Sequence, residues 1–412
     1  MSHPPSKLVG MRTAYKCRAY PDPDQAAMLA RTFGCVRVVW NRTLAARHAR
    51  WAAEQRGTSY RETDAALTAM KRLPELAWLN DVSSVPLQQT LRHQHNAFRA
   101  FFAGRARYPR YKSRNGRQVA HYTRSAFGYR DGELTLAKTT SPLRYVWSWP
   151  DDPATLAPTT VTVSRDPDGR WYVSFAVDVA DPAPLPASGL AVGIDLGIAD
   201  FATLSSGEKI AHPRTLARRE RNLARYQRRM ALKVKGSANR AKAKAKVARA
   251  HRKVRASRAD FLHRVSTRLV RDHGMIAVED LNVRGMVRNR HLAKAIADSG
   301  WGTFRAMLAY KAEQAGRRLV VIGRFYPSSK TCSACWHLPA ALSLRTRTWQ
   351  CPSCGTLHDR DVNAAKNILA AGRAVAACGG DVSHAGSPRV QSPVKQEPQR
   401  VTAGIPVLQG RE

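Results

Sequence analysis

Acidic residues are scarce in this sequence, and the imbalance is the first indication of function. The 412 residues include 30 Asp and Glu against 68 Lys and Arg, which gives a formal net charge of +38 and an isoelectric point of about 10.9. An enzyme for small substrates gains nothing from this self-repulsion, whereas a polyphosphate partner would offset it and release counterions. We therefore expect a nucleic-acid partner; a membrane surface and a generally basic proteome stay as alternatives.

Long apolar runs are also missing. Nowhere do 18 apolar residues follow one another, and no apolar segment follows the N-terminal MSHPPSKLVGMRT. A membrane-spanning helix and a secretory leader both need such a run. The sequence therefore predicts a soluble cytoplasmic protein, and its length allows two or three domains.

Cysteine is too sparse for a disulfide framework. Four of the seven cysteines form two C-x-x-C pairs, and Cys17, Cys35 and Cys378 are scattered. This pattern favours a metal site in a reducing compartment. Chance cysteines or a redox pair are the alternative.

The two cysteine pairs have the spacing of a zinc ribbon. Fifteen residues separate the first pair from the second, and the pairs are Cys332 with Cys335 and Cys351 with Cys354. Four thiolates fill the tetrahedral shell of one Zn²⁺ and leave no position for a substrate, so this zinc would be structural. His337 and His358 lie nearby and are expected to be surface residues.

The order of periodic segments predicts an α/β multidomain protein. One strand is expected at 11–21, helices at 24–107 with Asp24 as N-cap, and strands between 118 and 179, where RDPDG forms a hairpin turn. From Leu190 onward, strand and helix patterns alternate, as in α/β folds. They enclose a helical stretch at 214–264 with nineteen Lys and Arg and only two acids.

Three acids sit where a charge is costly. Asp195 lies within the apolar segment AVGIDLGI, Glu279 ends the apolar segment MIAVE, and Asp361 opens a helix. A buried carboxylate needs a partner, so an ion pair with Arg or Lys would explain any one of them. As a converging set they would instead bind Mg²⁺ or Mn²⁺ and support two-metal hydrolysis of a phosphodiester.

Three further acids are weaker candidates. Asp280 would point to the opposite face of its strand from Glu279, although it is the most plausible substitute for it. Asp359 is well placed to cap the helix that Asp361 opens. Asp200 completes this group.

Several segments together resemble the TnpB (OrfB) family. They are YKCRAYPDPDQ, FGCVRVVWN, GIDLGIADFATLSSG, IAVEDLNVRGM, YPSSKTCSACW and CPSCGTLHDRDVNAAKNIL. The family comprises compact RNA-guided DNA endonucleases of insertion sequences, related to type V CRISPR effectors. The resemblance covers about residues 11–376 and implies a RuvC-like nuclease domain of RNase H fold with an inserted Cys₄ zinc ribbon, an N-terminal wedge β-barrel and a helical recognition domain.

The resemblance also implies how the chain is divided. The expected parts are a first wedge strand (1–20), the helical recognition domain (21–118), the rest of the wedge barrel (119–181), a linker (182–189), the first nuclease part (190–327), the zinc ribbon (328–357), the last nuclease segment (358–376) and a disordered tail (377–412).

The implied site uses Asp195, Glu279 and Asp361 as catalytic ligands of two Mg²⁺ or Mn²⁺ ions, and the four paired cysteines as ligands of one Zn²⁺. The implied partners are a guide RNA and double-stranded target DNA cut beside a short adjacent motif. A protein monomer with its RNA is expected, in the prokaryotic cytoplasm and at the nucleoid when bound to DNA. A miniature type V effector and a cleavage-inactive, RNA-guided repressor are the alternatives.

Basic segments supply candidate nucleic-acid contacts. One mixes arginines with Phe101, Phe102, Tyr108 and Tyr111, a composition suited to phosphate contact and base stacking, although the Phe pair favours a helix core. The other is the 214–264 stretch, whose alternative interpretation is a solvated pair of charged helices. The predicted contacts are Arg105, Arg107, Arg110, Lys112, Arg114, Arg228, Arg229, Lys242 and Lys246.

Overall fold

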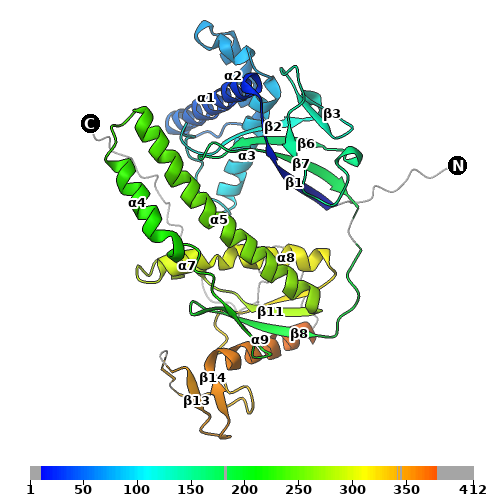
Figure 1. Ribbon diagram of the computed structural model, residues 1–412, viewed down its shortest axis with the longest axis vertical. Coiled ribbons are helices and arrows are strands. Elements are labelled where there is room, and N and C mark those ends of the chain that lie inside the picture. The colour runs from blue at the N-terminus through cyan, green and yellow to red at the C-terminus, as the bar shows by residue number, and fades with distance from the viewer. Residues whose placement is uncertain (1–10, 181–182, 341, 344–345, 378–412) are drawn as a thin grey trace, which may run out of the picture.

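A computed structural model of the chain describes residues 11–180, 183–340, 342–343 and 346–377 (Figure 1). The expected disordered tail lies outside these residues except for Ala377, which ends a helix. Among the described helices, none has the length and apolar character needed to cross a membrane.

An antiparallel sheet forms the core of the N-terminal half. Its order is β2-β6-β7-β1-β5, with alternate residues such as Cys17 and Phe175 buried. Its strands are β1 (Met11–Ala19), β2 (Gln118–Thr123), β5 (Tyr145–Val146), β6 (Thr160–Arg165) and β7 (Trp171–Val179). A separate hairpin joins β3 (Phe127–Arg130) to β4 (Glu133–Leu136), and short 3₁₀ turns occupy Arg124–Ala126 and Pro153–Thr155.

The strand pairings do not confirm the expected wedge β-barrel. Among the described residues, β2 and β5 are the edges of this sheet and do not pair with each other. The predicted hairpin turn is present, because β6 and β7 pair in antiparallel register on either side of Asp166–Arg170. Gly169 in this turn has φ +87°, a conformation that favours glycine.

Helical segments occupy most of the sequence between β1 and β2. They are α1 (Pro23–Glu54), α2 (Tyr60–Arg72), α3 (Ser84–Phe102) and a 3₁₀ segment at Pro74–Asn80. The N-cap of α1 is Asp22 and not Asp24: the Asp22 side chain accepts a hydrogen bond from the Gln25 backbone N–H at 2.8 Å. Pro23 occupies the first helical position, where its missing N–H and fixed φ are tolerated, so the cap must precede it.

A mixed five-stranded sheet organises the C-terminal half. Its order is β10-β9-β8-β11-β12. Strands β8, β11 and β12 run parallel, and β9 is antiparallel to both of its neighbours, β8 and β10. The strands are β8 (Ala191–Leu196), β9 (Asp200–Leu204), β10 (Lys209–Ala211), β11 (Met275–Glu279) and β12 (Arg318–Ile322).

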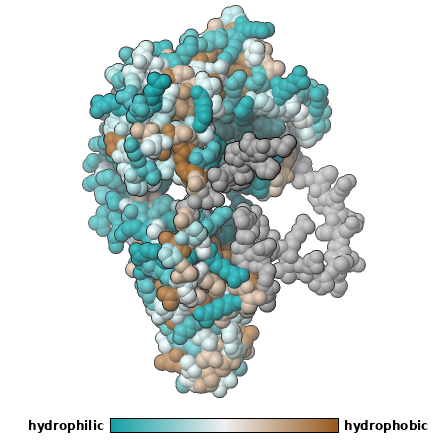
Figure 2. Space-filling view, turned by 90° about the vertical axis from the view of Figure 1, so that its right-hand side faces the viewer, coloured by the Kyte–Doolittle hydropathy of each residue, from teal (hydrophilic) through white to brown (hydrophobic). Residues whose placement is uncertain are grey.

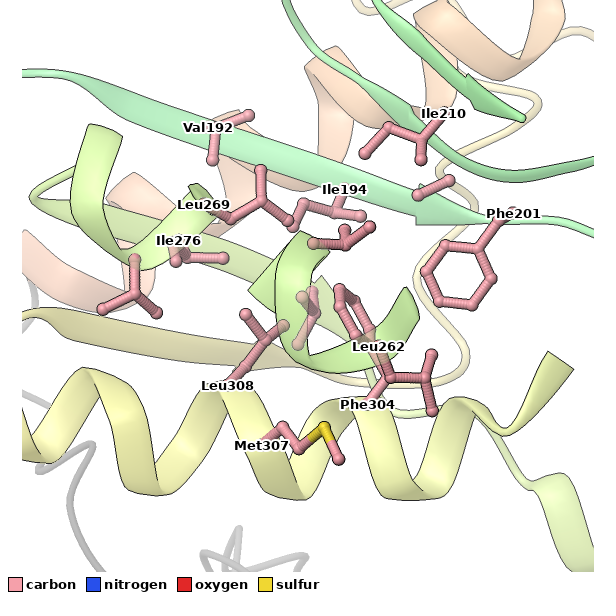
Figure 3. Close-up of a cluster of buried hydrophobic side chains, with 14 of the residues drawn as sticks. Val192, Ile194, Phe201, Ile210, Leu262, Leu269, Ile276, Phe304, Met307 and Leu308 are labelled. Atoms are coloured by element: carbon pink, nitrogen blue, oxygen red, sulfur yellow. The ribbon is translucent and has the colours of Figure 1, made fainter. Parts of the chain in front are cut away.

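Helices cover both faces of this sheet. On one face, α5 (Ala238–Asp272) and α8 (Trp301–Gln314) enclose a core in which Ile194, Leu262 and Phe304 meet (Figure 3). On the other face lies α9 (Arg360–Ala377). Shorter helices are α4 (Glu220–Ala231), α6 (Val283–Met286), α7 (Ala293–Ser299) and a 3₁₀ turn at Ala217–Arg219. The basic 214–264 stretch is therefore largely the packed pair α4 and α5.

Helix α9 approaches the sheet very closely. A Cβ atom built on Gly193 of β8 would lie 2.1 Å from the Ala365 carbonyl oxygen and 2.6 Å from the Leu369 backbone nitrogen. Only glycine fits at this contact. The glycine in the GIDLG motif thus sets the distance between β8 and the helix that carries Asp361.

Residues 183–190 have no regular secondary structure but are attached to the C-terminal half. The Leu185 N–H donates to the Ala315 carbonyl at 3.1 Å, and the Ser188 hydroxyl donates to the Asp272 carbonyl at 3.3 Å. The described part of the expected linker therefore lies along the α/β unit.

Candidate active site and metal centre

Two of the predicted acids lie side by side on parallel strands. The register pairs Val278 of β11 with Ile194 of β8, so Asp195 and Glu279 occupy the next position along each strand. Side chains alternate along a strand, and Gly193 and Ala277 both contact α9. Asp195 and Glu279 therefore face α9, while Ile194 and Val278 point into the core.

The third acid stands in the first turn of α9. Asp359 caps this helix as predicted, since its Oδ1 accepts hydrogen bonds from the backbone N–H groups of Asp361 (3.0 Å) and Val362 (3.1 Å). Its Oδ2 accepts from Lys209 Nζ at 2.7 Å. The cap and the tight contact at Gly193 place Asp361 over the carboxyl ends of β8 and β11.

Asp195 is influenced electrostatically by the other two carboxylates. The pKa of Asp195 is raised to about 7, first by burial, then by the charges of Asp361 and Glu279, and Arg360 opposes the shift. Burial, followed by the charge of Asp280, raises the pKa of Glu279. Repulsion of this kind at a buried carboxylate is what a bound cation relieves.

A further acid in the same region, Asp280, is neutralised by arginine. Asp280 accepts hydrogen bonds from Arg305 and Arg324, which lower its pKa against the opposing effect of partial burial. Among the described residues, Asp195 and Glu279 form no ion pair, and Asp361 lies 3.6 Å from Arg347 Nη1. The ion-pair explanation therefore fits Asp280 and Asp361 and fails for Asp195 and Glu279.

The donor set of these acids fits a hard divalent cation. Carboxylate oxygens are the ligands that Mg²⁺ and Mn²⁺ prefer, and these ions retain several waters in such sites. Among the described residues, the four cysteines are the one group of possible metal ligands whose donor atoms converge on a single point; the three acids do not converge in this way.

The four paired cysteines do converge, and their geometry fits zinc. Their Sγ atoms all lie within 4.8 Å of one another; Cys332 and Cys354 are 3.7 Å apart, and Cys335 and Cys351 3.6 Å. A tetrahedral site with Zn–S bonds of ~2.3 Å requires sulfur separations of ~3.8 Å. The short strands β13 (Thr348–Gln350) and β14 (Leu357–Asp359) pair beside this cluster.

The expectation of two surface histidines is wrong for one of them. His337 is exposed, but His358 is buried, and its ring lies 4.9 Å from that of Trp349, its partner across the β13–β14 pair. The Nε2 atom of His358 is 3.0 Å from Cys332 Sγ. His358 therefore packs against the cysteine cluster.

Sequence reasoning missed two buried asparagines on α9. Asn363 Nδ2 donates to the Thr331 carbonyl (2.8 Å), and Asn367 Nδ2 donates to the carbonyls of Thr331 (2.6 Å) and Ser328 (2.8 Å). Their signature was available: two asparagines four residues apart share a helix face, and asparagine is a poor helix-interior residue without a specific partner.

The predicted nucleic-acid contacts are surface residues with one exception. Lys112 is half-buried with its ammonium 4.4 Å from the centroid of the Trp40 ring, and burial lowers its pKa. Phe102, expected in a helix core, is 73% exposed. The exposed candidates are Arg105, Arg107, Arg110, Arg114, Arg228, Arg229, Lys242 and Lys246.

Part of the basic surface of α5 is occupied by the protein itself. Arg252 Nε lies 2.6 Å from Asp168 Oδ2 and Arg255 Nη2 lies 2.9 Å from Asp166 Oδ2, and both aspartates belong to the β6–β7 turn. On the face shown in Figure 2, hydrophilic residues dominate the upper half, whereas pale and brown residues gather at the lower tip, where Figure 1 places β13 and β14.

Sequence profiles of known domains match most of this architecture. They are a profile described as a probable transposase at 174–290, the Cas12f1-like TNB domain at 301–368 and a helix-turn-helix domain at 11–56. A protein of Streptomyces pristinaespiralis named "Putative RNA-guided DNA endonuclease" is 54% identical over 402 residues, which cover 97% of this chain and 99% of that protein. The chain belongs to the TnpB (OrfB) family.

Further comparisons agree with membership of the TnpB family. A relative from Escherichia coli K12, named "Putative RNA-guided DNA endonuclease InsQ", is 32% identical over 93% of this chain and 97% of its own length. The fold resembles that of a Cas12f1 chain solved with sgRNA and target DNA, with a TM-score of 0.53 and 11% identity over 87% of this chain and 99% of that one. The family resemblance expected from the sequence motifs is confirmed.

Proposed function

We propose that this TnpB family member is an RNA-guided DNA endonuclease that hydrolyses phosphodiester bonds at Asp195, Glu279 and Asp361. The observation that carries the proposal is that Asp195 and Glu279 lie side by side at the carboxyl ends of two parallel strands, without the arginine partners that neutralise Asp280. Asp361 stands at the start of the helix that packs against these strands. Two relatives that match nearly the whole chain carry the same activity in their names.

The fold supports a RuvC-like nuclease domain. Strands β8, β9 and β10 form an antiparallel meander, and β11 and β12 then add in parallel on the other side of β8. This is the order expected for an RNase H-type sheet. In open α/β sheets, reacting groups gather beyond the carboxyl ends of the strands. We extend the proposal to the domain division given above, with the N-terminal sheet as the wedge and α1 to α3 as the recognition domain.

The chain's residues would divide the work of hydrolysis. When bound, two Mg²⁺ or Mn²⁺ ions activate a water and stabilise the leaving 3′-oxygen. Asp195, Glu279 and Asp361 would be the residues that hold these ions. The N-terminus of α9 adds a positive potential beside the scissile phosphate. The zinc ribbon would keep its Zn²⁺ in a structural role.

The net charge and the exposed arginines and lysines support a guide RNA and target DNA as partners. Base pairing would then read the target, and the protein would contact the heteroduplex backbone. Such an enzyme would act in the cytoplasm of its host, at the nucleoid when it is bound to DNA.

The test uses the protein purified with its co-expressed RNA. Asp195→Asn, Glu279→Gln and Asp361→Asn are each expected to reduce Mg²⁺-dependent cleavage of a matched plasmid at least about 10²-fold, since each removes charge stabilisation of the transition state. Guided DNA binding should persist. Asp260→Asn, at an exposed acid of α5, is the control with normal cleavage. Efficient cutting by the triple variant would refute the site, and absence of cutting by the wild type would favour the RNA-guided repressor.

A further inference from the structure

We propose that Asn363 and Asn367 are positioning residues that couple the zinc knuckle to the nuclease carboxylate Asp361. This inference rests on the proposed function for its effect on cleavage. Its structural basis is a set of hydrogen bonds between α9 and residues 328–333, which include Cys332 of the first cysteine pair.

Asn363 holds the peptide groups on both sides of one zinc ligand. Its Nδ2 donates to the carbonyl of Thr331 at 2.8 Å, and its Oδ1 accepts from the N–H of Ser333 at 2.9 Å. The residue between these two is Cys332, which is fully buried. A side-chain amide thus pairs with the backbone as a neighbouring strand would, and it fixes where Cys332 stands.

Asn367 strengthens the same attachment one helical turn later. It is completely buried, and its Nδ2 donates to the carbonyls of Ser328 at 2.8 Å and Thr331 at 2.6 Å. Its Oδ1 has no hydrogen-bond partner within the described structure. A buried acceptor without a partner is unfavourable, and an apolar residue would fill the space without that cost. The donor function of Asn367 is therefore the property that the site uses.

The link from the knuckle to the carboxylate is short and stiff. Asp361 precedes Asn363 by two residues in the first turn of α9, a rise of about 3 Å along the helix axis. Two residues after Asn363, the helix cannot approach β8 more closely, because the Ala365 carbonyl is already in contact with Gly193. A shift of the knuckle must therefore move the first turn, where Asp361 lies.

The second half of the ribbon reaches the same turn independently. The Arg360 N–H donates to the Arg347 carbonyl at 2.8 Å, and Asp359, the cap of α9, is the last residue of β14. Zinc joins the two halves of the ribbon, so the ion would fix both attachments at once. The asparagine pair is the part of this connection that can be removed without touching a zinc ligand or a carboxylate.

The experiment compares Asn363→Leu and Asn367→Leu with Asn96→Leu, an exposed asparagine of α3, in the RNA-bound protein. Two quantities are measured: the rate of zinc release to a chromogenic chelator, and the Mg²⁺ concentration that gives half-maximal cleavage. Loss of a group that orients a metal ligand typically weakens the site 10–100-fold. We expect zinc release to accelerate by about tenfold or more, and the Mg²⁺ requirement to rise in parallel, with DNA binding unchanged.

The outcomes separate the possible roles. Faster zinc release with a normal Mg²⁺ requirement would overturn the coupling, and normal behaviour in both measurements would overturn the positioning role altogether. If the wild type does not cleave, the proposed function fails, whereas faster zinc release would still support the attachment of the knuckle. If the leucine variants do not fold, Asn363→Ser and Asn367→Ser carry the same comparison.

Discussion

The substitution Gly193→Ala tests the packing that brings Asp361 to the strands. The new Cβ would meet two backbone atoms of α9, the Ala365 carbonyl oxygen at 2.1 Å and the Leu369 nitrogen at 2.6 Å. Backbone atoms in the middle of a helix cannot rotate away as a flexible side chain does. The helix as a whole must move.

The required movement can be estimated from these distances. Ordinary Cβ contacts lie at 3.4 Å or more, so the gap must open by 3.4 − 2.1 = 1.3 Å. Overpacking of this kind typically costs about 1–3 kcal/mol of folding free energy. For a unit of about 190 residues this lowers Tm by roughly 3–10 °C. A misplacement of about 1 Å in a catalytic group can reduce the rate 10²-fold.

The assays are thermal unfolding of the zinc-loaded protein and plasmid cleavage at saturating Mg²⁺. Gly128→Ala is the matched control, because Gly128 also lies in a strand and its Cβ would meet no atom within 4 Å. We expect the control to leave both quantities unchanged, while Gly193→Ala lowers both. Wild-type stability and cleavage in Gly193→Ala would show that α9 does not sit on β8 as described.

Three further predictions concern other parts of the molecule. The wild type should hold one zinc per chain, and Cys351→Ser should lose the metal and destabilise the ribbon, whereas a wild type without zinc would refute the site. Burial, then nearby His93, Lys112 and Arg117, lower the pKa of His121 to about 3, below the usual 6.5. Below pH 6.5 the unfolded chain binds a proton at His121 that the folded chain does not bind, so the free energy of unfolding falls on acidification, by about 2 kcal/mol at pH 5. His121→Gln should abolish this part of the loss when unfolding is measured as a function of pH. Lys242→Ala with Lys246→Ala should flatten the salt dependence of RNA binding, by a slope of about 0.7–0.9 per lost phosphate contact, and an unchanged slope would exclude them as contacts.

Much of the fold could be predicted from periodicity. The strands at 11–19 and 171–179 alternate cleanly, and the apolar strands that carry Asp195 and Glu279 are short segments between turns. Whether the first sheet is open or forms a barrel could not be predicted, because buried and exposed side chains alternate along a strand in the same way in both. The α1 cap was mispredicted, although Pro23 contains the information that places it at Asp22.

The candidate site was predicted through its charges and its cysteines, and its supports were not. An acid in an apolar strand is costly and therefore visible in the sequence. Asn363 and Asn367 share a helix face in the sequence, but their partners are backbone groups thirty and more residues away, which the side-chain pattern does not identify. His358 was missed for the same reason: its burial depends on pairing with Trp349 across two three-residue strands.

Part of the positive charge of the protein is used in ion pairs within the chain and is not free for a nucleic acid. Along α5, Arg252 and Arg255 bind the aspartates of the β6–β7 turn, whereas Lys242 and Lys246 remain exposed nearer its N-terminus. The arginines can hold a carboxylate with a planar fork, while a lysine offers a mobile point charge suited to phosphates in varied positions. The middle of the helix therefore joins the N-terminal sheet to the α/β unit, and the exposed lysines nearer its N-terminus are left without these aspartate partners. Neutralising the first pair should alter how the two halves are held together, and neutralising the second should alter only nucleic-acid affinity.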